Sequence, residues 1–226
     1  MFDIQDDRKQ LLATGWFGSR GARFQKDLLE CATKKTFGAF ETLYHSGDPA
    51  NGVYTVLDGA VQITAPADDG QEFVLHRQGG GFWIGDLALF ADAQRLVSVV
   101  ATQETRTLFF PSTRVDRLVK ENPEYIRDFY ALTHENMQTA LRIMANLAVT
   151  GTEKRLVLRL LHLDEGTSKS NGWITVSQDE LAEMVAVSQP TLHRNLHRLA
   201  DLGLIELGYG RVRLRNRRKL IASCQS

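Results

Sequence analysis

The stretch ITVSQDELAEMVAVSQPTLHRNLHRLADL, residues 174–202, predicts two short helices joined by a tight turn. Ser177 can cap the first helix, and Glu180, three residues later, can return a bond to the backbone amide of the cap. Residues 186–188 then interrupt the apolar spacing. Ser188 can cap the second helix, and Pro190 falls in its first turn, where a missing amide costs nothing. These signals predict a helix-turn-helix.

The second helix has two distinct faces. Leu192, Leu196 and Leu199 recur at helical spacing and are expected in the core. The outer face is expected to hold Ser188, Gln189, Pro190, Thr191, His193, Arg194 and His197. Their hydrogen-bonding groups suit base edges and phosphates, so this helix is predicted to recognise DNA.

The sequence after this helix pair predicts a β-hairpin. Residues 204–207 and 211–215 have the pattern of short strands around a turn at Gly208-Tyr209-Gly210. Arg211, Arg213 and Arg215 alternate and would share one face. Most amphipathic helix pairs have no special function. A helix-turn-helix followed by a hairpin with a basic face, however, is typical of a winged helix that binds double-stranded DNA.

Charge is unevenly distributed along the chain, although the total is neutral. Residues 151–226 hold 12 Lys and Arg against 8 Asp and Glu, while residues 1–150 hold 15 against 19. A basic C-terminal third is expected where one module docks on phosphates. For residues 217–219 a solvated strand and tail is an equally good interpretation.

Length and composition set further bounds. A chain of 226 residues with 43% hydrophobic residues can fill two cores. We find no signal-peptide pattern and no apolar run of ~18 residues, so we expect a cytoplasmic protein with no membrane partner. Cys31 and Cys224 are too few and too far apart for a disulfide framework or a Cys-ligated cluster.

Residues 37–111 have the pattern of a β-roll. Short apolar stretches recur at residues 53–57, 61–65, 73–75, 96–101 and 108–110. Turn sequences such as Asp58-Gly59 and Asp68-Asp69-Gly70 separate them, which favours a jelly-roll-like double-stranded roll. A helix is expected before it, near residues 24–33. The roll's His, Asp and Glu residues form no recognisable catalytic pair and no metal-ligand spacing, so an enzyme is not expected.

A long helix is predicted after residue 121. Asn122-Pro123-Glu124 suits a helix start, with Asn122 as the cap. A seam of residues then steps by four and three: Ile126, Tyr130, Thr133, Met137, Ala140, Met144 and Leu147. Such a seam favours a parallel homodimer, while Phe129 and Leu141, just off it, favour contact with the roll. We therefore predict an α+β chain with a sensor roll at 1–121, a dimerisation helix at 122–150 and a winged helix-turn-helix at 151–226.

Three segments together resemble the Crp/Fnr family of bacterial transcription regulators. HSGDPANGVYTVLDGAVQI (45–63) resembles its turn-and-strand signature, FWIGDLALF (82–90) its phosphate-binding cassette, and residues 174–205 its helix-turn-helix. The resemblance covers nearly the whole chain. It implies a homodimer on a two-fold DNA site that responds to a signal sensed in the roll, with RNA polymerase as a further partner.

The effector pocket departs from the cyclic-AMP-binding members of that family. In the Gly85-Asp86-Leu87 turn the acid is one methylene shorter than the family's Glu. Arg95 is available for a phosphate, but Leu96 stands in place of a Ser, and Ala140-Leu141 replaces a Thr-Ser pair. Each lost partner costs about 1–3 kcal/mol, so cyclic AMP is disfavoured. The candidate walls are Phe82, Trp83, Leu89, Leu96 and Leu141. The pocket either holds an apolar effector or is packed shut, and Trp83 is expected to be a core residue.

Other sensing chemistries can be compared with the same residues. In the family that the chain resembles, sensing through an iron–sulfur cluster needs several closely spaced N-terminal cysteines. This chain has only Cys31 in that region, which excludes such a cluster. Haem needs an axial ligand, for which His45 and His76 are the candidates in the roll. We expect both to be turn or surface residues. The alternatives are a cyclic-nucleotide- or haem-dependent regulator of the same fold and a purely cyclic-nucleotide-binding regulatory module.

The resemblance also assigns roles within the recognition helix. Arg194 matches the family's main base-contacting arginine, which suits guanine. Gln189 replaces an arginine and suits adenine, and Pro190 replaces a glutamate and can pack on a thymine methyl. His193 is expected near a base edge. Ser188, Thr191, His197 and the wing residue Arg211 are expected at the DNA backbone, and Ala186 occupies a turn position that is often Gly.

Overall fold

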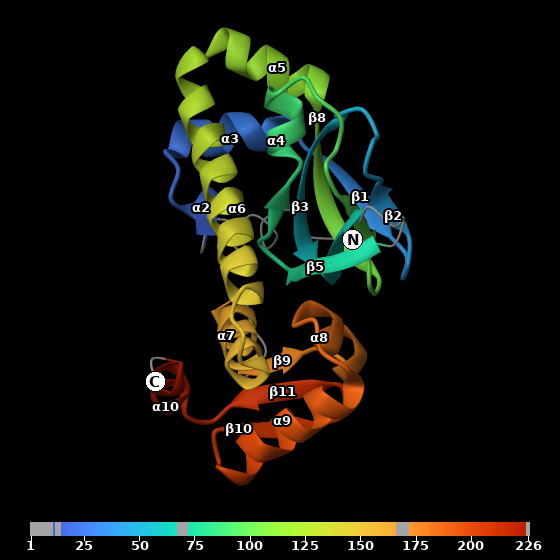
Figure 1. The fold of residues 1–226 in the computed structure, drawn as a ribbon. Helices are drawn as coiled ribbons and strands as arrows, with labels where there is room; N and C mark the ends of the chain where they lie inside the picture. The colour runs from blue at the N-terminus through green and yellow to red at the C-terminus, as the bar shows by residue number, and fades with distance from the viewer. Residues whose placement is uncertain (1–10, 12–14, 67–71, 166–171, 225–226) are drawn as a thin grey trace. The chain divides into compact units, whose positions relative to one another are not determined.

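The structure, a computed structural model, describes residues 11, 15–66, 72–165 and 172–224 (Figure 1). The chain divides into two compact units, residues 1–139 and 140–226, and the division falls within the long helix. The α+β class is confirmed. The three predicted domain ranges stay predictions, and the predicted turn at residues 68–70 lies outside the described residues.

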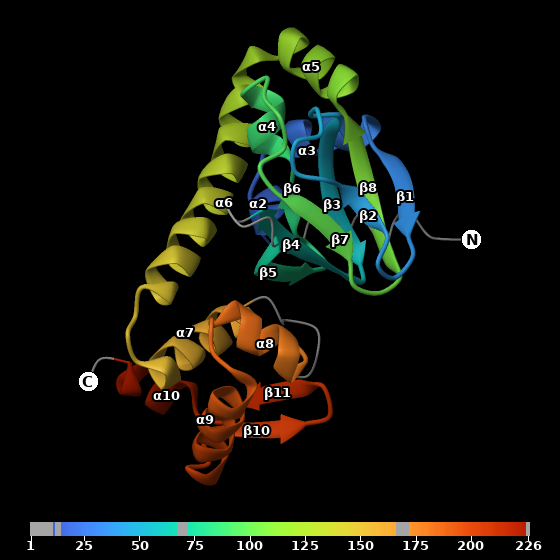
Figure 2. The same cartoon turned by 45° about the vertical axis from the view of Figure 1, so that its right-hand side comes forward.

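The first unit is built around two antiparallel four-stranded sheets. Their strand orders are β1-β8-β3-β6 and β2-β7-β4-β5 (Figure 2). The strands are β1 (Thr33–Phe37), β2 (Thr42–Tyr44), β3 (Gly52–Asp58), β4 (Ala60–Pro66), β5 (Glu72–Gly79), β6 (Trp83–Ile84), β7 (Ser98–Ala101) and β8 (Thr105–Pro111). Val56 and Phe109 of one sheet share a core with Ile63 and Val99 of the other, which confirms the predicted roll.

A second core lies between the roll and the helices that cover one of its sides. The helices are α2 (Gly15–Gly18), α3 (Ala22–Glu30), α4 (Asp86–Phe90) and α5 (Ser112–Glu121). Trp83 stacks on Phe17 and Phe110, with ring centroids 5.2 and 5.0 Å apart, so its predicted place in the core is confirmed.

The start of the long helix differs from the prediction. A short 3-10 turn, η1 (Pro123–Tyr125), precedes α6 (Ile126–Leu147). Asn122 makes no capping bond; its amide donates to the carbonyl of Leu118 in α5 and its oxygen accepts from Arg23. The predicted cap is therefore wrong, because the preceding residues continue as a helix that the sequence analysis did not foresee.

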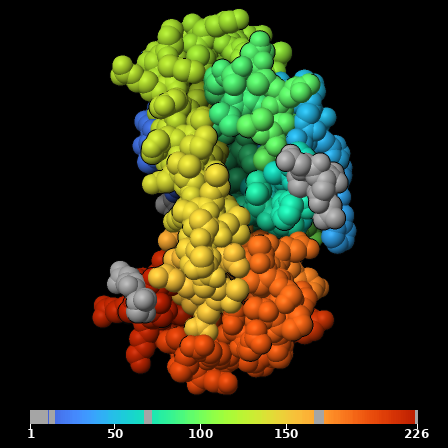
Figure 3. All heavy atoms as spheres, in the orientation of Figure 1, coloured from blue at the N-terminus to red at the C-terminus, as the bar shows by residue number. Residues whose placement is uncertain are grey.

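The seam of α6 is open to solvent. Its large apolar side chains Ile126, Tyr130, Met137, Met144 and Leu147 are all exposed. In Figure 3 the helix, yellow-green to yellow, is uncovered on the side turned to the viewer. Phe129, off the seam, is fully buried against Phe24 and Phe90, which confirms its predicted contact with the first unit's core.

The second unit is a winged helix-turn-helix, as predicted. Its elements are α7 (Thr152–Glu165), β9 (Trp173–Thr175), α8 (Gln178–Met184), α9 (Gln189–Asp201), β10 (Ile205–Gly208), β11 (Arg211–Leu214) and α10 (Arg217–Ser223). The three strands form one antiparallel sheet with β11 in the middle. Residues 217–219 begin α10, with Asn216 accepting from the Lys219 amide at 3.0 Å, so the alternative interpretation of these exposed residues as a strand and tail is wrong.

Candidate nucleic-acid interface and effector pocket

Reciprocal hydrogen bonds fix the start of α8. The Ser177 hydroxyl accepts from the Glu180 amide at 3.2 Å, and the Glu180 carboxylate accepts from the Ser177 amide at 2.8 Å. This confirms the predicted capping box. The first helix of the pair therefore begins at a defined residue, which sets the place where the second helix can cross it.

The turn between the two helices needs one left-handed residue. Ala186 has φ of +49°, a conformation that is uncommon for a residue with a side chain. Ser188 occupies the cap position of α9, but its hydroxyl donates to the Thr191 hydroxyl at 3.0 Å and makes no capping bond. The predicted side-chain cap is therefore wrong, although the helix begins where it was expected.

The outer face of α9 gathers most of the predicted DNA-contacting residues. Leu192, Leu196 and Leu199 are buried, which turns the opposite side outward. Ser188, Gln189, Pro190, His193, Arg194 and His197 are exposed, and Thr191 is half-buried. The rings of His193 and His197 lie 4.2 Å apart along that face. Their roles in DNA contact stay predictions.

One predicted base-contacting group has a partner within the domain. The Gln189 amide donates to the Asp179 carboxylate of α8 in a very short contact. Both side chains are exposed, so an adenine edge would have to compete with this carboxylate. Residue spacing within α9 carries no information about α8, so this bond could not be predicted from the sequence.

The wing arginines lie on an aromatic ring that the sequence analysis did not single out. The guanidinium groups of Arg211 and Arg213 lie 4.3 and 4.7 Å from the ring of Trp173 in β9. The register places Arg213 opposite Trp173 and Arg211 opposite Thr175. Stacking of this kind limits the freedom of a guanidinium plane while leaving its N–H groups able to donate.

An acidic residue lies within the same face of the wing. Glu206 of β10 pairs with Arg213 across the hairpin. Its Oε2 accepts from Arg213 Nε at 3.0 Å and lies 2.6 Å from Arg215 Nη2. These bonds, the one from Arg213 first, lower the pKa of Glu206, which keeps the carboxylate charged. The predicted basic face is therefore partly neutralised from within.

In the roll, Asp86 points toward the long helix. It is 2% exposed, at the start of α4, where Gly85 has φ of +108°. Its carboxylate accepts from the Thr133 hydroxyl at 2.5 Å and from the Asn136 amide at 2.9 Å, both on α6. Burial raises its pKa above the ordinary value, although these bonds favour the charged form. Both oxygens of the predicted effector acid are used inside the protein.

Arg95 is also buried and bonded internally. Its Nη1 donates to the carbonyl of Gly85 at 2.8 Å, and its Nη2 donates to Gly52 at 2.6 Å and to the Asn51 side chain at 2.8 Å. The guanidinium lies 4.2 Å from the ring of Tyr44. A Cβ on Gly85 would come within 2.7 Å of Nη1, so only glycine permits this approach. Among the described residues, Nε has no partner.

Comparison with known proteins shows what this arrangement belongs to. Residues 34–122 match the family model of the cyclic nucleotide-binding domain, and residues 154–223 match that of the Crp-like helix-turn-helix domain. The chain is 29% identical over 183 residues to the cAMP-activated global transcriptional regulator CRP of Haemophilus influenzae, covering 79% of this chain and 81% of the relative. The chain belongs to the Crp/Fnr family.

Solved structures of family members agree with the fold. FixK2 from Bradyrhizobium japonicum matches with a TM-score of 0.76 at 22% identity, covering 84% of this chain and 96% of FixK2. The Crp/Fnr-family transcriptional regulator TTHA1359 from Thermus thermophilus matches with a TM-score of 0.67 at 25% identity, covering 86% and 99%. The protein is thus a transcription regulator with a DNA-binding helix-turn-helix domain, and the relative from Haemophilus influenzae is likewise a transcription regulator.

The other predicted pocket residues of this Crp/Fnr protein differ in exposure. Phe82 and Leu89 are half-buried and Leu87 is exposed. Leu96, on the segment after α4, is 66% exposed. Ala140 and Leu141 lie on α6 beyond the division between the units, and both are exposed. Their membership of an effector site stays a prediction.

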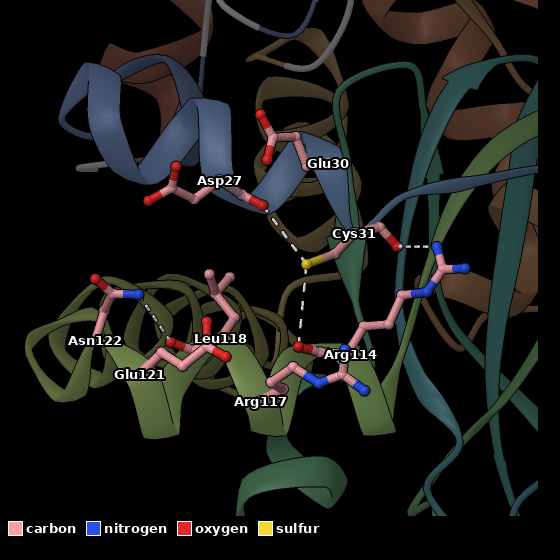
Figure 4. A pocket seen from close by; sticks show the side chains of 8 residues that line it. All are labelled: Asp27, Glu30, Cys31, Arg114, Arg117, Leu118, Glu121 and Asn122. Atoms are coloured by element: carbon pink, nitrogen blue, oxygen red, sulfur yellow. Dashed lines mark hydrogen bonds between the residues drawn. The ribbon is translucent and has the colours of Figure 1, made fainter.

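Two open cavities lie on the first unit, and neither matches the predicted pocket. One, of about 500 Å³, shares only Leu89 with the predicted walls. The other, of about 440 Å³, lies between α3 and α5 (Figure 4). Negatively charged carboxylates and positively charged guanidinium groups surround Cys31 there. Burial raises the pKa of the Cys31 thiol, which donates to the Asp27 carbonyl. The thiol is therefore in its unreactive, protonated form.

The two candidate haem ligands differ from each other. His45 is an exposed turn residue, as predicted. His76 is buried in β5, with its Nε2 2.5 Å from the Gln78 side chain, so the prediction of a surface position is wrong. In the described part of the chain, no three His, Cys, Asp or Glu residues gather to hold a metal ion. No helix there is long and apolar enough to cross a bilayer.

Proposed function

We propose that this Crp/Fnr regulator acts as a homodimer on an inverted-repeat operator and does so without cyclic AMP. The observation that supports binding to an inverted-repeat operator is the exposed face of α9. In a two-fold dimer the paired recognition helices enter successive major grooves about 34 Å apart. Arg194 is then the guanine-contacting residue and Arg211 a phosphate-contacting residue.

Binding-site selection with two variants tests this assignment. Arg194→Ala should cost about 1–3 kcal/mol per half-site and relax the preference at one G·C position, because a bidentate contact is lost. Arg211→Ala should weaken binding to all sequences alike and reduce the dependence on salt. If Arg194→Ala kept the wild-type consensus and Arg211→Ala changed it, the wing would be the sequence-recognising element.

The open seam of α6 supports the dimer. Burial of its apolar side chains against a second copy would remove them from water at about 25 cal/mol per Å². Met137→Asp would place two charges face to face in that interface, and both dimerisation and DNA affinity should fall. Gln138→Asp, on the same helix but off the seam, is the matched control. A wild type that sediments as a monomer at micromolar concentration while binding a palindrome would contradict the dimer.

The internal bonds of Asp86 and Arg95 support independence from cyclic AMP. A ribose hydroxyl would have to displace Thr133 or Asn136, and a phosphate would have to displace carbonyl groups that already accept from Arg95. The relative from Haemophilus influenzae is described as cAMP-activated, and that property is its own. We expect no rise in Tm with cyclic AMP in a thermal-shift titration, and a saturable rise would contradict this part of the proposal.

One observation favours the alternative of a nucleotide-dependent regulator. The buried Nε of Arg95 has no partner among the described residues, and an anionic oxygen would satisfy it. The same titration therefore includes other cyclic nucleotides and inorganic phosphate. A saturable shift that Arg95→Gln abolishes would establish the alternative.

A further inference from the structure

The outward face of the wing places an acid and an aromatic ring on either side of one arginine. Glu206, Arg213 and Trp173 form a row across the three strands, because Arg213 is in register with both of the others. Val212, next to Arg213 on β11, is buried, so this row lies on the face opposite the core. The row belongs to the same hairpin as Arg211.

Glu206 bonds two of the three wing arginines. Arg213 approaches it through both Nε and Nη2, and Arg215 approaches the same oxygen through Nη2. Arg211 instead lies on Trp173, at 4.3 Å from the ring. Of the three arginines, Arg211 is the one that can meet a phosphate without first leaving a carboxylate.

The arrangement is open enough for exchange of partners. The side chain of Glu206 is 34% exposed, that of Arg213 28% and that of Arg215 53%. Exposed ion pairs contribute little to folding, so DNA phosphates can compete for these arginines. A phosphate brought close to Glu206 would also meet like-charge repulsion unless the arginines remained between them.

We propose that Glu206 competes with DNA phosphates for Arg213 and Arg215 and so limits the sequence-independent part of DNA affinity. This inference rests on the proposed DNA-binding function and deepens it. Contacts from Arg194 to bases do not involve the wing carboxylate, whereas non-specific affinity comes almost entirely from phosphate contacts. Glu206 therefore lowers affinity through the phosphate contacts, whatever the DNA sequence, and leaves the base contacts of Arg194 unchanged.

The test compares Glu206→Gln with wild type in the full chain, on a selected operator and on a random duplex, over a range of salt. Each added phosphate contact steepens the slope of log K against log salt by about 0.9. We expect up to two added contacts per protomer. The ratio of the association constant of Glu206→Gln to that of wild type should then fall by about 3.5-fold per added contact when salt is raised from 50 to 200 mM. The gain should be similar on the operator and on the random duplex, because both present phosphates to the wing.

Three controls separate competition from other effects. Glu183→Gln makes the same change of charge at an exposed position of α8. It should leave the slope of log K against log salt unchanged. Glu206→Gln should have no effect in an Arg213→Gln, Arg215→Gln background, since nothing is left to release. Glu206→Asp, which keeps the charge, should lie closer to wild type than Glu206→Gln. Near-ultraviolet circular dichroism confirms that each variant keeps its wing.

The outcomes distinguish this inference from the proposed function. Weaker binding by Glu206→Gln, or an unchanged slope, would mean that the carboxylate organises the arginines for DNA, and would overturn the competition. An equal gain in Glu183→Gln would also overturn it. A wild type that binds no duplex in site selection, by contrast, would overturn the proposed function itself.

Discussion

The roll and the winged helix both hold charged side chains of the kinds that bind ligands, but they point them in opposite directions. Asp86 and Arg95 are buried and bonded to their own chain. Arg194 and Arg211 lie on exposed faces of α9 and β11. The comparison teaches that residue type alone does not make a binding group. The group must also have hydrogen-bonding capacity that the fold has not used.

The two regions therefore differ in what a substitution should change. In the roll, removing a buried charged group leaves its hydrogen-bond partners with neither a water molecule nor a protein group to bond. The cost is therefore a loss of folding stability. In the winged helix, an exposed group has water available in the free protein, so the cost falls on binding.

Removal of the Arg95 guanidinium should have the largest effect on stability. Arg95→Met leaves the carbonyls of Gly85 and Gly52 and the Asn51 side chain without their donor, and we expect a loss of about 3–5 kcal/mol in the free energy of unfolding of the roll. Lys26→Met, which removes an exposed ion pair to Glu30 at 3.9 Å, should cost under about 1 kcal/mol. Urea unfolding measures both. Equal losses would mean that the internal bonds of Arg95 have no special weight.

The second largest effect is expected from acid, which should lower the folding stability of the second unit. Burial first, and then Arg142 and Arg159, lower the pKa of His162 in α7 to about 4. The unfolded chain binds this proton near pH 6.5, so stability is full above that pH and falls as the pH drops toward 4. The loss should approach about 3 kcal/mol. Hydrogen exchange of α7 amides measures it, and His162→Gln should remove most of the dependence. A wild type as stable at pH 4.5 as at pH 7 would show that the histidine is protonated in the fold.

The smallest effect, and the opposite sign, is expected at Asp86. Burial raises the pKa of this carboxyl, so the folded roll holds the proton at a higher pH than the unfolded chain, and stability falls as the pH rises above about 4. Asp86→Asn removes this dependence and keeps the planar shape of the side chain, so at pH 7 we expect a change under about 1 kcal/mol in the free energy of unfolding. Thermal unfolding of the roll at pH 5 and pH 8 tests it. A large loss at pH 7 would mean that the charge itself holds α6.

Much of the fold follows from local sequence signals. The capping box at Ser177, the left-handed turn at Ala186 and the buried leucines of α9 are all local, since each depends on residues within one or two helical turns. The elements that were missed have weak local patterns. β1 is mostly polar and exposed, and the residues of α5 precede an Asn that resembles a cap.

The partners within the sites could not be predicted in the same way. Asp179 and Gln189 lie on different helices, and Glu206 meets Arg213 only because of the hairpin register. Asp86 reaches Thr133 and Asn136 across some fifty residues of chain. Sequence spacing identifies residue types and faces, but these contacts depend on how distant elements pack.

The tryptophan beneath the wing arginines gives the protein an optical reporter of its own. Of the three tryptophans, Trp16 and Trp83 are buried in the first unit, and Trp173 is half-buried under Arg211 and Arg213. An arginine that moves to a phosphate uncovers part of the Trp173 ring. We therefore expect DNA to change the emission and the acrylamide quenching of one tryptophan in three, so that engagement of the wing can be followed without any added label.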